Sequence, residues 1–445
     1  MKRKGAVESH AGKHSMQHTR RAMRLMSLLI VCVLALVLFS PAALAAVDSG
    51  AEQEEIGYGV SSFVGFGSQS GTSFTAGQTG ATSMTAQLKK LWTNRSEKLD
   101  VSTWGYAAGP GWCNFDDVYF GTLFENPQLF YVDCYYSYTY RLSDNRLMSI
   151  TPRYLVSKSK LPAYQKKYEQ SVANALQYVN DSMTDLEKVI ALHDYLALYS
   201  KYDNRFYTGG MPQVSYSSYG VLTLGLGVCQ SYSLALIDLL AREGIDSCFV
   251  KSVSMNHGWV MVEVDGKWYH VDTTWDDPLN VMDYVTHDYL LCSGKAISNK
   301  DHYDFFWYTN DPAATDTRYD NAWWQELNWP MYYVNGRWVY TDGWNVYANN
   351  TKGTNPTLLI CNDNENNDMR FARFKNKLVY SNGRNIYYCS ATGQNSKLYW
   401  TLDRYKGYEN AEIIEMRIIP YGIKWYLQVV VATENAEIPL TKRLA

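Results

Sequence analysis

Two short strand-like runs joined by a two-residue turn constrain the fold more than any other feature of this sequence. The runs are HGWVMVEV at residues 257–264 and KWYHVDTTW at residues 267–275, with Asp265-Gly266 between them. Asp-Gly between runs rich in β-branched and aromatic residues is a strong signal of a β-hairpin with a two-residue loop. Such a loop pairs Val264 with Lys267, and the rest of the register follows from that pair.

The predicted register sorts the hairpin residues into two faces. The packing face is expected to hold Val260, Val262, Val264, Tyr269 and Val271. On the other face, His257 opposes Thr274 and Trp259 opposes Asp272. His257 and Asp272 are then diagonal neighbours, with Cβ atoms roughly 7 Å apart. We therefore expect a polar face on which an imidazole and a carboxylate meet.

Cys229 lies in a second informative stretch, GVLTLGLGVCQSYSLALIDLLAREG at residues 220–244. Apolar spacing predicts a helix over residues 231–242, so the cysteine lies where the helix begins. A helix N-terminus and a neighbouring imidazolium both favour the thiolate, the nucleophilic form of cysteine. Cys229 as nucleophile, His257 as base and Asp272 as orienting carboxylate would complete a triad.

Three motifs together resemble the transglutaminase-like superfamily, especially its exported bacterial branch, over about residues 160–305. They are EKVIALHDYLALYSKYD, YGVLTLGLGVCQSYSLALIDLLAREGI and HGWVMVEVDGKWYHVDTTWDDP, in that order. The resemblance implies a papain-like α+β fold, with Cys229 as nucleophile, His257 as general base and Asp272 as orienter. Departures from the family pattern leave these three positions intact; they are Ser231, Ser233, Gly258 and Val260.

The other histidines near these motifs are predicted to have secondary or structural roles. His270 shares the face of Asp272 and is the alternative base. His193, in the middle of a helical run, is predicted to be structural. His287 and His302 are predicted to be loop or packing residues.

For the oxyanion, the backbone N–H of Cys229 is one predicted donor, with Gln230 and Tyr219 as candidate side-chain donors. The acids of Trp275-Asp276-Asp277-Pro278 are expected to cap a turn at the rim of the site. No cofactor and no metal are predicted, because the histidines and cysteines lack the spacing of metal ligands. The oxygen-rich segment 363–368 also lacks the glycine and the terminal glutamate of a calcium loop.

Residues 1–45 have the form of a secretory signal peptide, with basic residues, an apolar run and Ala43-Leu44-Ala45 before Ala46. The alternative is an uncleaved membrane anchor. We expect a secreted or cell-surface protein that meets the membrane only through this segment, if it is uncleaved. Removing it leaves 34 basic residues (41 less 7) and 43 acidic residues (44 less 1), a formal charge of −9. That charge disfavours nucleic acid as a partner.

Seven of the eight cysteines follow this leader. An odd number in an exported chain leaves at least one thiol unpaired. The other six could form three disulfides or none.

The sequence divides into six predicted segments. These are a signal peptide (1–45), a flexible Gly/Ser/Thr-rich linker (46–85), an aromatic-rich subdomain (86–157), a catalytic domain (158–305), a connector (306–330) and a C-terminal β-repeat domain (331–445). Helical spacing over 161–203, with a capping box at Thr184 and Glu187, precedes strand-like runs. This order predicts an α+β domain.

An internal repeat marks the last segment. VYTDGWNVY at 339–347 recurs as VYSNGRNIY at 379–387, an offset of 40 residues, and each copy has a turn dipeptide between aromatic strand runs. A doubtful third copy lies near YGIKWYLQVVV at 421–431. We expect an incomplete, propeller-like all-β module that either binds wall polymer or substrate protein or only packs against the catalytic domain.

The predicted chemistry is attack of a thiolate on a peptide or carboxamide carbonyl to give a thioester. Transfer to water is hydrolysis, and transfer to a lysine amine is crosslinking. We expect a protease or amidase that acts on protein or peptide substrates, including cell-wall or surface proteins. The alternatives are a protein-glutamine transglutaminase or deamidase, and a catalytically silent wall-binding protein.

Overall fold

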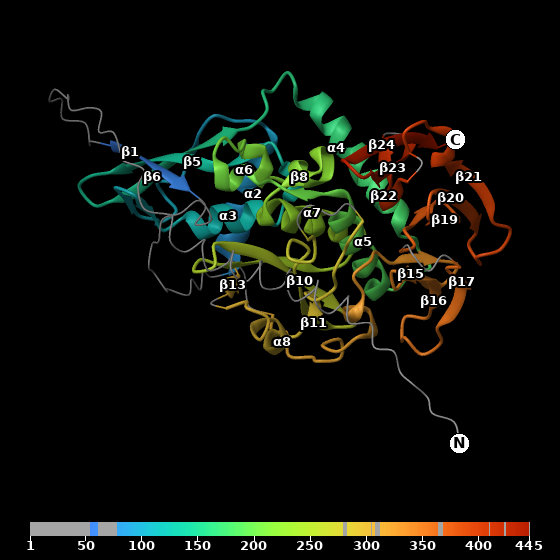
Figure 1. The fold of residues 1–445 in the computed structure, drawn as a ribbon. Helices are drawn as coiled ribbons and strands as arrows, with labels where there is room; N and C mark the ends of the chain where they lie inside the picture. Colours follow the sequence, from blue (N-terminus) through green and yellow to red (C-terminus); the bar gives the residue numbers. More distant parts are fainter. Residues whose placement is uncertain are drawn as a thin grey trace. The chain divides into compact units, whose positions relative to one another are not determined.

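The computed structural model describes residues 54–60, 78–278, 283–303, 305–307, 312–363, 368–408, 410–421 and 424–444 (Figure 1). The predicted signal peptide, most of the predicted linker and residues 364–367 lie outside the described residues. Among the helices of the described ranges, none is both long and apolar enough to cross a membrane.

A four-stranded antiparallel sheet with the order β1-β5-β6-β2 comes first in the chain. Its strands are β1 (Glu54–Val60), β2 (Leu99–Asp100), β5 (Val132–Arg141) and β6 (Arg146–Tyr154). Helices α2 (Gln78–Thr93) and α3 (Asp116–Phe124) and a hairpin of β3 (Ala108–Gly109) and β4 (Trp112–Cys113) accompany it. Along β5, Tyr136, Tyr138 and Tyr140 are buried at the two-residue period of a strand.

Part of the segment predicted as a flexible linker, residues 46–85, is ordered. Strand β1 and the first half of α2 fall inside it. Strand β1 pairs with β5 along its full length, from Glu54 opposite Arg141 to Val60 opposite Tyr135. The linker prediction is therefore wrong for these residues, because pairing at a sheet edge depends on a distant strand and not on local composition.

Helices α4 (Leu161–Ala175), α5 (Asp185–Tyr199) and α7 (Cys229–Arg242) follow the first sheet. The predicted capping box at the start of α5 is confirmed: Glu187 N–H donates to Thr184 Oγ1 at 3.3 Å, and Thr184 N–H donates to the Glu187 carboxylate at 2.9 Å. Reciprocal bonds of this kind satisfy N–H groups that a helix start leaves without partners.

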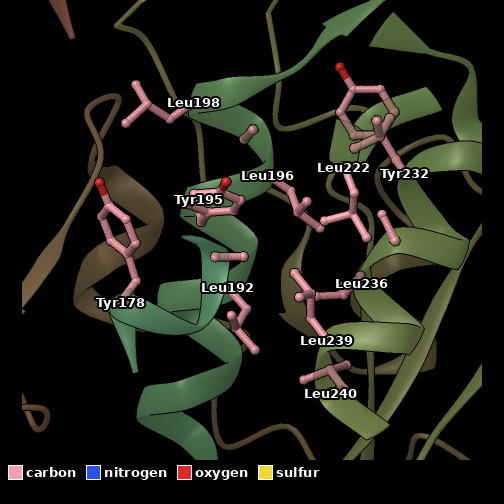
Figure 2. Close-up of a cluster of buried hydrophobic side chains, with 14 of the residues drawn as sticks. Tyr178, Leu192, Tyr195, Leu196, Leu198, Leu222, Tyr232, Leu236, Leu239 and Leu240 are labelled. Atoms are coloured by element: carbon pink, nitrogen blue, oxygen red, sulfur yellow. The ribbon is translucent and has the colours of Figure 1, made fainter. Parts of the chain in front are cut away.

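Helices α5 and α7 pack against each other through leucines. Figure 2 shows Leu192 and Leu196 of α5 directed toward Leu236 and Leu239 of α7. All four side chains are buried, at 1% exposure or less. Each such side chain stabilises the fold by about 1.5–3 kcal/mol through the apolar surface it removes from water. This interface holds α7, and therefore the cysteine at its first position.

The second sheet has five strands in the antiparallel order β12-β11-β10-β9-β13. They are β9 (Ser247–Ser252), β10 (His257–Val264), β11 (Lys267–Val271), β12 (Leu290–Cys292) and β13 (Phe305–Trp307). The predicted hairpin register is confirmed, since Val264 pairs with Lys267 and Val260 pairs with Val271. Asp265 and Gly266 both have positive φ, at 52° and 71°, as a tight hairpin turn requires.

The two faces of this sheet differ from the prediction in one respect. The packing face is confirmed, because its five predicted residues join the main hydrophobic core. The other face is not polar along its length: Trp259 and Met261 form a second apolar cluster with Val250, Cys292 and Ile297. Ile297 belongs to α8 (Gly294–Ser298), which the hairpin pattern could not reveal. The polar pair is therefore confined to one end of that face.

The C-terminal region consists of three antiparallel sheets, coloured orange to red in Figure 1. The first contains β14 (Tyr332–Val334), β15 (Arg337–Thr341), β16 (Val346–Asn349) and β17 (Thr357–Ile360); the second contains β18 (Phe371–Phe374), β19 (Lys377–Asn382), β20 (Asn385–Ser390) and β21 (Lys397–Thr401). The third contains β22 (Glu412–Tyr421), β23 (Lys424–Ala432) and β24 (Glu437–Leu444). The two repeat copies occupy β15-β16 and β19-β20, and the doubtful copy falls on a three-stranded sheet. The fold is α+β with a C-terminal all-β repeat module.

Candidate active site

Cys229 is the first residue of α7, at the end of a short, closely packed approach. Gly225 adopts the left-handed conformation with φ of 65°, and Val228 is the extended N-cap residue. The parallel strands β7 (Lys201–Tyr202) and β8 (Leu226–Gly227) hold this approach. The cysteine is 6% exposed. The start of the 14-residue helix favours a negative charge on its sulfur.

Ser231, one of the departures from the family pattern, packs against the glycine turn. A Cβ atom at Gly227 would lie 2.5 Å from both Cβ and Oγ of Ser231, so a larger residue does not fit there. The Ser231 hydroxyl donates to the Ser217 carbonyl and accepts from the Val221 N–H at 3.0 Å. The serine therefore ties the first turn of α7 to the segment that precedes it.

Ser233, the second such departure, links the helix that carries Cys229 to the strand that carries His257. Its hydroxyl lies 2.9 Å from the Cys229 carbonyl oxygen and 3.1 Å from the Gly258 carbonyl oxygen. Gly258 follows His257 in β10. One side chain thus fixes the separation between the elements that bear Cys229 and His257.

His257 and Asp272 are in direct contact at the end of the hairpin. His257 begins β10, Asp272 directly follows β11, and His257 Nε2 lies 2.6 Å from Asp272 Oδ2. Asp272 Oδ1 accepts the backbone N–H groups of Thr274 at 3.0 Å and Trp275 at 3.3 Å. With Nε2 engaged, Nδ1 is the ring nitrogen left for Cys229, which acts on the ring by hydrogen bonding and by charge.

The electrostatics of these three groups favour a charged imidazole. Burial opposes a charge on His257, but the Asp272 carboxylate and then Cys229 outweigh it and raise the pKa of His257 to about 10. Burial would raise the pKa of Asp272, yet His257 and His302 hold that pKa well below its usual range. An imidazolium next to a cysteine at a helix start is the setting in which a thiolate is stabilised.

The alternative base, His270, is engaged elsewhere. Its Nδ1 accepts the indole N–H of Trp259 at 3.0 Å. Burial, and then the electrostatic interaction with the His302 ring, lowers the pKa of His270 to about 3. His257 contacts the Asp272 carboxylate, whereas Nδ1 of His270 contacts Trp259.

A second histidine, predicted to be a loop or packing residue, contacts the same carboxylate. His302 Nε2 lies 2.9 Å from Asp272 Oδ2, and its side chain is fully buried. The His302 ring centroid is 4.6 Å from that of Trp275 and 4.7 Å from that of Trp259. Sequence reasoning missed this residue because it carries no motif and lies 30 positions beyond Asp272.

Gln230 does not have the geometry of an oxyanion donor. Its Nε2 lies 2.9 Å from the Cys134 sulfur and 3.0 Å from the Tyr216 carbonyl oxygen, so both amide protons already have acceptors. The other candidate, Tyr219, packs in an aromatic cluster with Phe130, at a centroid separation of 4.9 Å. The backbone N–H of Cys229 thus stays the predicted donor to the oxyanion.

Tyr202 is a neighbour of Cys229 that sequence reasoning did not identify. It lies in β7, opposite Gly227, and its ring stacks on that of Tyr207 at 6.0 Å. Burial, and then the charge of Cys229, raises the pKa of Tyr202 well above its usual range. The only available signal was the Tyr202-Asp203 pair after the first motif, and its spacing to the cysteine has no regular meaning.

Of the two acids predicted to lie at the rim, Asp276 belongs to the interior and Asp277 is partly exposed. Asp276 is fully buried, with Oδ2 3.2 Å from Nε2 of His193. Asp277 accepts the hydroxyl of Tyr232 in α7. Trp275, which precedes them, packs against His257 at a centroid distance of 5.4 Å. These acids therefore hold the segment after Asp272 against the helices.

His193 has the structural role predicted for it, within a buried polar network. Its Nδ1 lies 2.9 Å from Asp194 Oδ1, and Asp194 also contacts His287 Nε2 at 3.1 Å. Burial opposes a charge on His193, but the carboxylates of Asp194 and Asp276 raise the pKa of His193 to about 9. His287, predicted as a loop or packing residue, is therefore a polar member of this network.

Among the residues that the structure describes, two buried clusters could hold a metal ion. They are His193, Asp194 and His287, and His257, Asp272 and His302. In both clusters each histidine already has a ring nitrogen at hydrogen-bonding distance from a carboxylate oxygen. Motif spacing could not find either cluster, because its members come from segments far apart in the sequence.

The seven cysteines of the described residues are all free thiols, so the alternative of three disulfides is not observed. Cys361 is exposed, whereas Cys229 is buried at the start of α7. Cysteine count alone could not distinguish these environments.

Residues 172–273 match the model of the transglutaminase-like superfamily. No curated protein matches the chain. A solved structure named "Crystal structure of a TGase" is 16% identical, with a TM-score of 0.23, over 29% of this chain and 42% of that chain. The assignment rests on the family match, which spans α5, Cys229 and the hairpin. Residues 172–273 of this chain belong to the transglutaminase-like superfamily.

Proposed function

We propose that the protein is an exported cysteine enzyme that cleaves peptide or carboxamide bonds through a thioester, with Cys229, His257 and Asp272 as its triad. One observation carries the proposal. His257 Nε2 lies 2.6 Å from Asp272 Oδ2, which leaves Nδ1 available for Cys229 at the start of α7, a residue that helps to raise the pKa of His257. This is the relation of nucleophile, base and orienting group that covalent catalysis requires.

The first half-reaction follows from these positions. His257 Nδ1 takes the thiol proton, and the Cys229 thiolate attacks the carbonyl carbon to form a C–S bond. The carbonyl electrons move onto oxygen, near the helix-start N–H groups. When the oxyanion collapses, the C–N bond breaks, and His257 returns its proton to the leaving amine or ammonia. A thioester on Cys229 remains.

The second half-reaction decides the outcome. In hydrolysis, His257 Nδ1 takes a proton from water, the water oxygen attacks the thioester carbon, and the C–S bond breaks to release acid and regenerate the thiol. We propose hydrolysis because water is abundant at an extracellular site, whereas crosslinking needs a channel that protects the thioester for an incoming amine. The proposed substrates are proteins or peptides, including those of the cell surface.

The test uses the full-length protein, its Cys229→Ala variant and a control variant, Cys361→Ala, which removes an exposed thiol outside the triad. Each is incubated with a glutamine-containing protein and a labelled primary amine. Mass spectrometry then measures new peptide termini, deamidation of glutamine and incorporation of the amine. New termini or deamidation lost only with Cys229→Ala would support hydrolysis. Amine incorporation lost with the same variant would establish transamidation instead. Equal activity of Cys229→Ala and wild type would refute the triad.

A further inference from the structure

Asp272 lies between two imidazole rings. Its Oδ2 is 2.6 Å from His257 Nε2 and 2.9 Å from His302 Nε2. Its Oδ1 accepts two backbone N–H groups from the segment that follows. Both carboxylate oxygens therefore have two partners each. A triad needs one imidazole on its carboxylate, so the second calls for a separate explanation.

The His302 ring is held firmly in this place. It is fully buried, and the aromatic rings of Trp259, Trp275 and Tyr289 lie within 4.6 to 5.1 Å of it. Its backbone N–H donates to the Ile297 carbonyl of α8 at 3.3 Å. The ring of Trp259 meets it edge to face, at 88°. The wall of three aromatic rings leaves the imidazole little freedom to turn away from the carboxylate.

We propose that His302 is a positioning residue that donates its Nε2–H to Asp272, holds that carboxylate toward His257 and limits the basicity of His257. The inference rests on the proposed function of the triad. A packing role alone does not account for the direction of Nε2. An apolar ring could pack against the same three aromatic rings without the cost of removing a polar group from water.

The effect on His257 follows from the shared oxygen. A hydrogen bond from a second donor stabilises the carboxylate charge, so less of that charge is available to stabilise the His257 imidazolium. An imidazolium held less tightly gives up its proton more readily to the leaving amine. Other titratable groups interact with members of this cluster. Cys229 of α7 acts on His257, and His302 acts on His270 of β11. Tyr289, before β12, interacts with Asp272 and also with Asp276, Asp288 and Asp301.

Two of these neighbours do not carry charge near neutral pH. The buried ring of His270 has its pKa lowered to about 3. Burial, and then the charge of Asp276, raises the pKa of Tyr289 far above its usual range. Removing the His302 donor should therefore act mainly through Asp272 on the pair of His257 and Cys229.

The test compares His302→Phe, which keeps an aromatic ring and removes the donor, with His302→Gln, which keeps a side-chain N–H. Full-length proteins are alkylated with iodoacetamide over a series of pH values, and peptide mapping reports the rate at Cys229 alone. We expect the alkaline limb of the His302→Phe profile to move up by about one pH unit, the equivalent of a tenfold change in the imidazolium equilibrium. Turnover should fall about tenfold, because the Asp272 carboxylate would no longer be held toward His257. The His302→Gln profile should return toward wild type.

Three results would overturn the inference. If His302→Phe and wild type have the same profile, the donor has no effect on His257. If His302→Gln behaves like His302→Phe, ring packing explains the residue. If Cys229 of the wild type titrates as an ordinary thiol, the triad itself fails, and this outcome is separate because it needs no variant. Should His302→Phe not fold, histidine-ring NMR of the wild type decides the matter: Nε2 of His302 should carry a slowly exchanging proton, and a deprotonated Nε2 would contradict the inference.

Discussion

Replacing Asp272 with asparagine should reverse the orientation of the proposed base. Oδ1 of Asp272 accepts two backbone N–H groups, so the amide oxygen of Asp272→Asn would take that place. The amide NH₂ group would then face Nε2 of His257, 2.6 Å from it in the wild type. A nitrogen facing a donor must accept, so the ring proton moves to Nδ1. His257 would then present a proton to Cys229 where the reaction needs an acceptor.

The expected loss of reactivity at Cys229 follows from the loss of the positive charge on His257. The Asp272 carboxylate is the main group that opposes burial and raises the pKa of His257 to about 10, so without it burial favours the neutral imidazole. Cys229 would then lose the imidazolium that stabilises its thiolate. We expect alkylation of Cys229 to slow near neutral pH, and turnover to fall by about 10⁴-fold, as for a base held in the wrong tautomer.

A matched carboxylate provides the control. Burial raises the pKa of Asp277 to about 8, so this group is mostly neutral at pH 7 and Asp277→Asn changes little of its charge. Its contact is with Tyr232 and not with a histidine. Site-resolved alkylation should therefore be normal for Asp277→Asn and slow for Asp272→Asn. Equal alkylation rates for Asp272→Asn and wild type would refute the assignment of Asp272 as the orienting group.

The other predictions concern stability. Leu236→Ala, in the interface of α5 and α7, should lower the free energy of unfolding in urea by about 2–5 kcal/mol, and Leu236→Met by less than about 1.5 kcal/mol; equal losses would contradict the packing argument. Gly227→Ala should cost about 1–3 kcal/mol, because its Cβ would overlap Ser231, and an unchanged urea midpoint would refute the fit. The pKa of His193 is raised from 6.5 to about 9. Its contribution, at most about 3 kcal/mol, is complete below pH 6.5 and is lost as pH rises through 9; a flat unfolding profile over that range would contradict it.

The parts of the site that depend on local rules could be predicted from the sequence. A two-residue Asp-Gly turn permits one register, and the side-chain period of two then decides which residues share a face. That is why the contact of His257 with Asp272 could be expected before the sheet was known. The start of α7 was placed two residues late, at Ser231, because periodic spacing does not distinguish the first helical residue from the cap.

Long-range contacts account for what could not be predicted. His302 returns to Asp272 only after the chain has formed β12 and α8, and no spacing rule relates residues across such an excursion. The apolar cluster beneath Trp259 depends on α8 in the same way. The acids after Trp275 matched a family motif, but their burial depends on His193 and Tyr232, which lie in two different helices.

Helix α5 connects the proposed site to the C-terminal module. One of its sides packs on α7, which begins at Cys229 (Figure 2). Its other contacts include the Met331 N–H, which donates to Asp194 at 2.6 Å, and the Arg417 guanidinium, which donates to the Leu198 carbonyl at 3.0 Å.

These contacts bear on what the C-terminal module does. Met331 begins the segment predicted as the β-repeat domain, and its N–H completes the partners of a buried carboxylate in α5. Leaving a buried acceptor without a hydrogen-bond donor lowers the stability of the fold by about 1–3 kcal/mol. The packing interpretation of the module therefore has direct contacts behind it. A binding role stays a prediction, and it would have to be carried by surfaces of the module that do not meet α5.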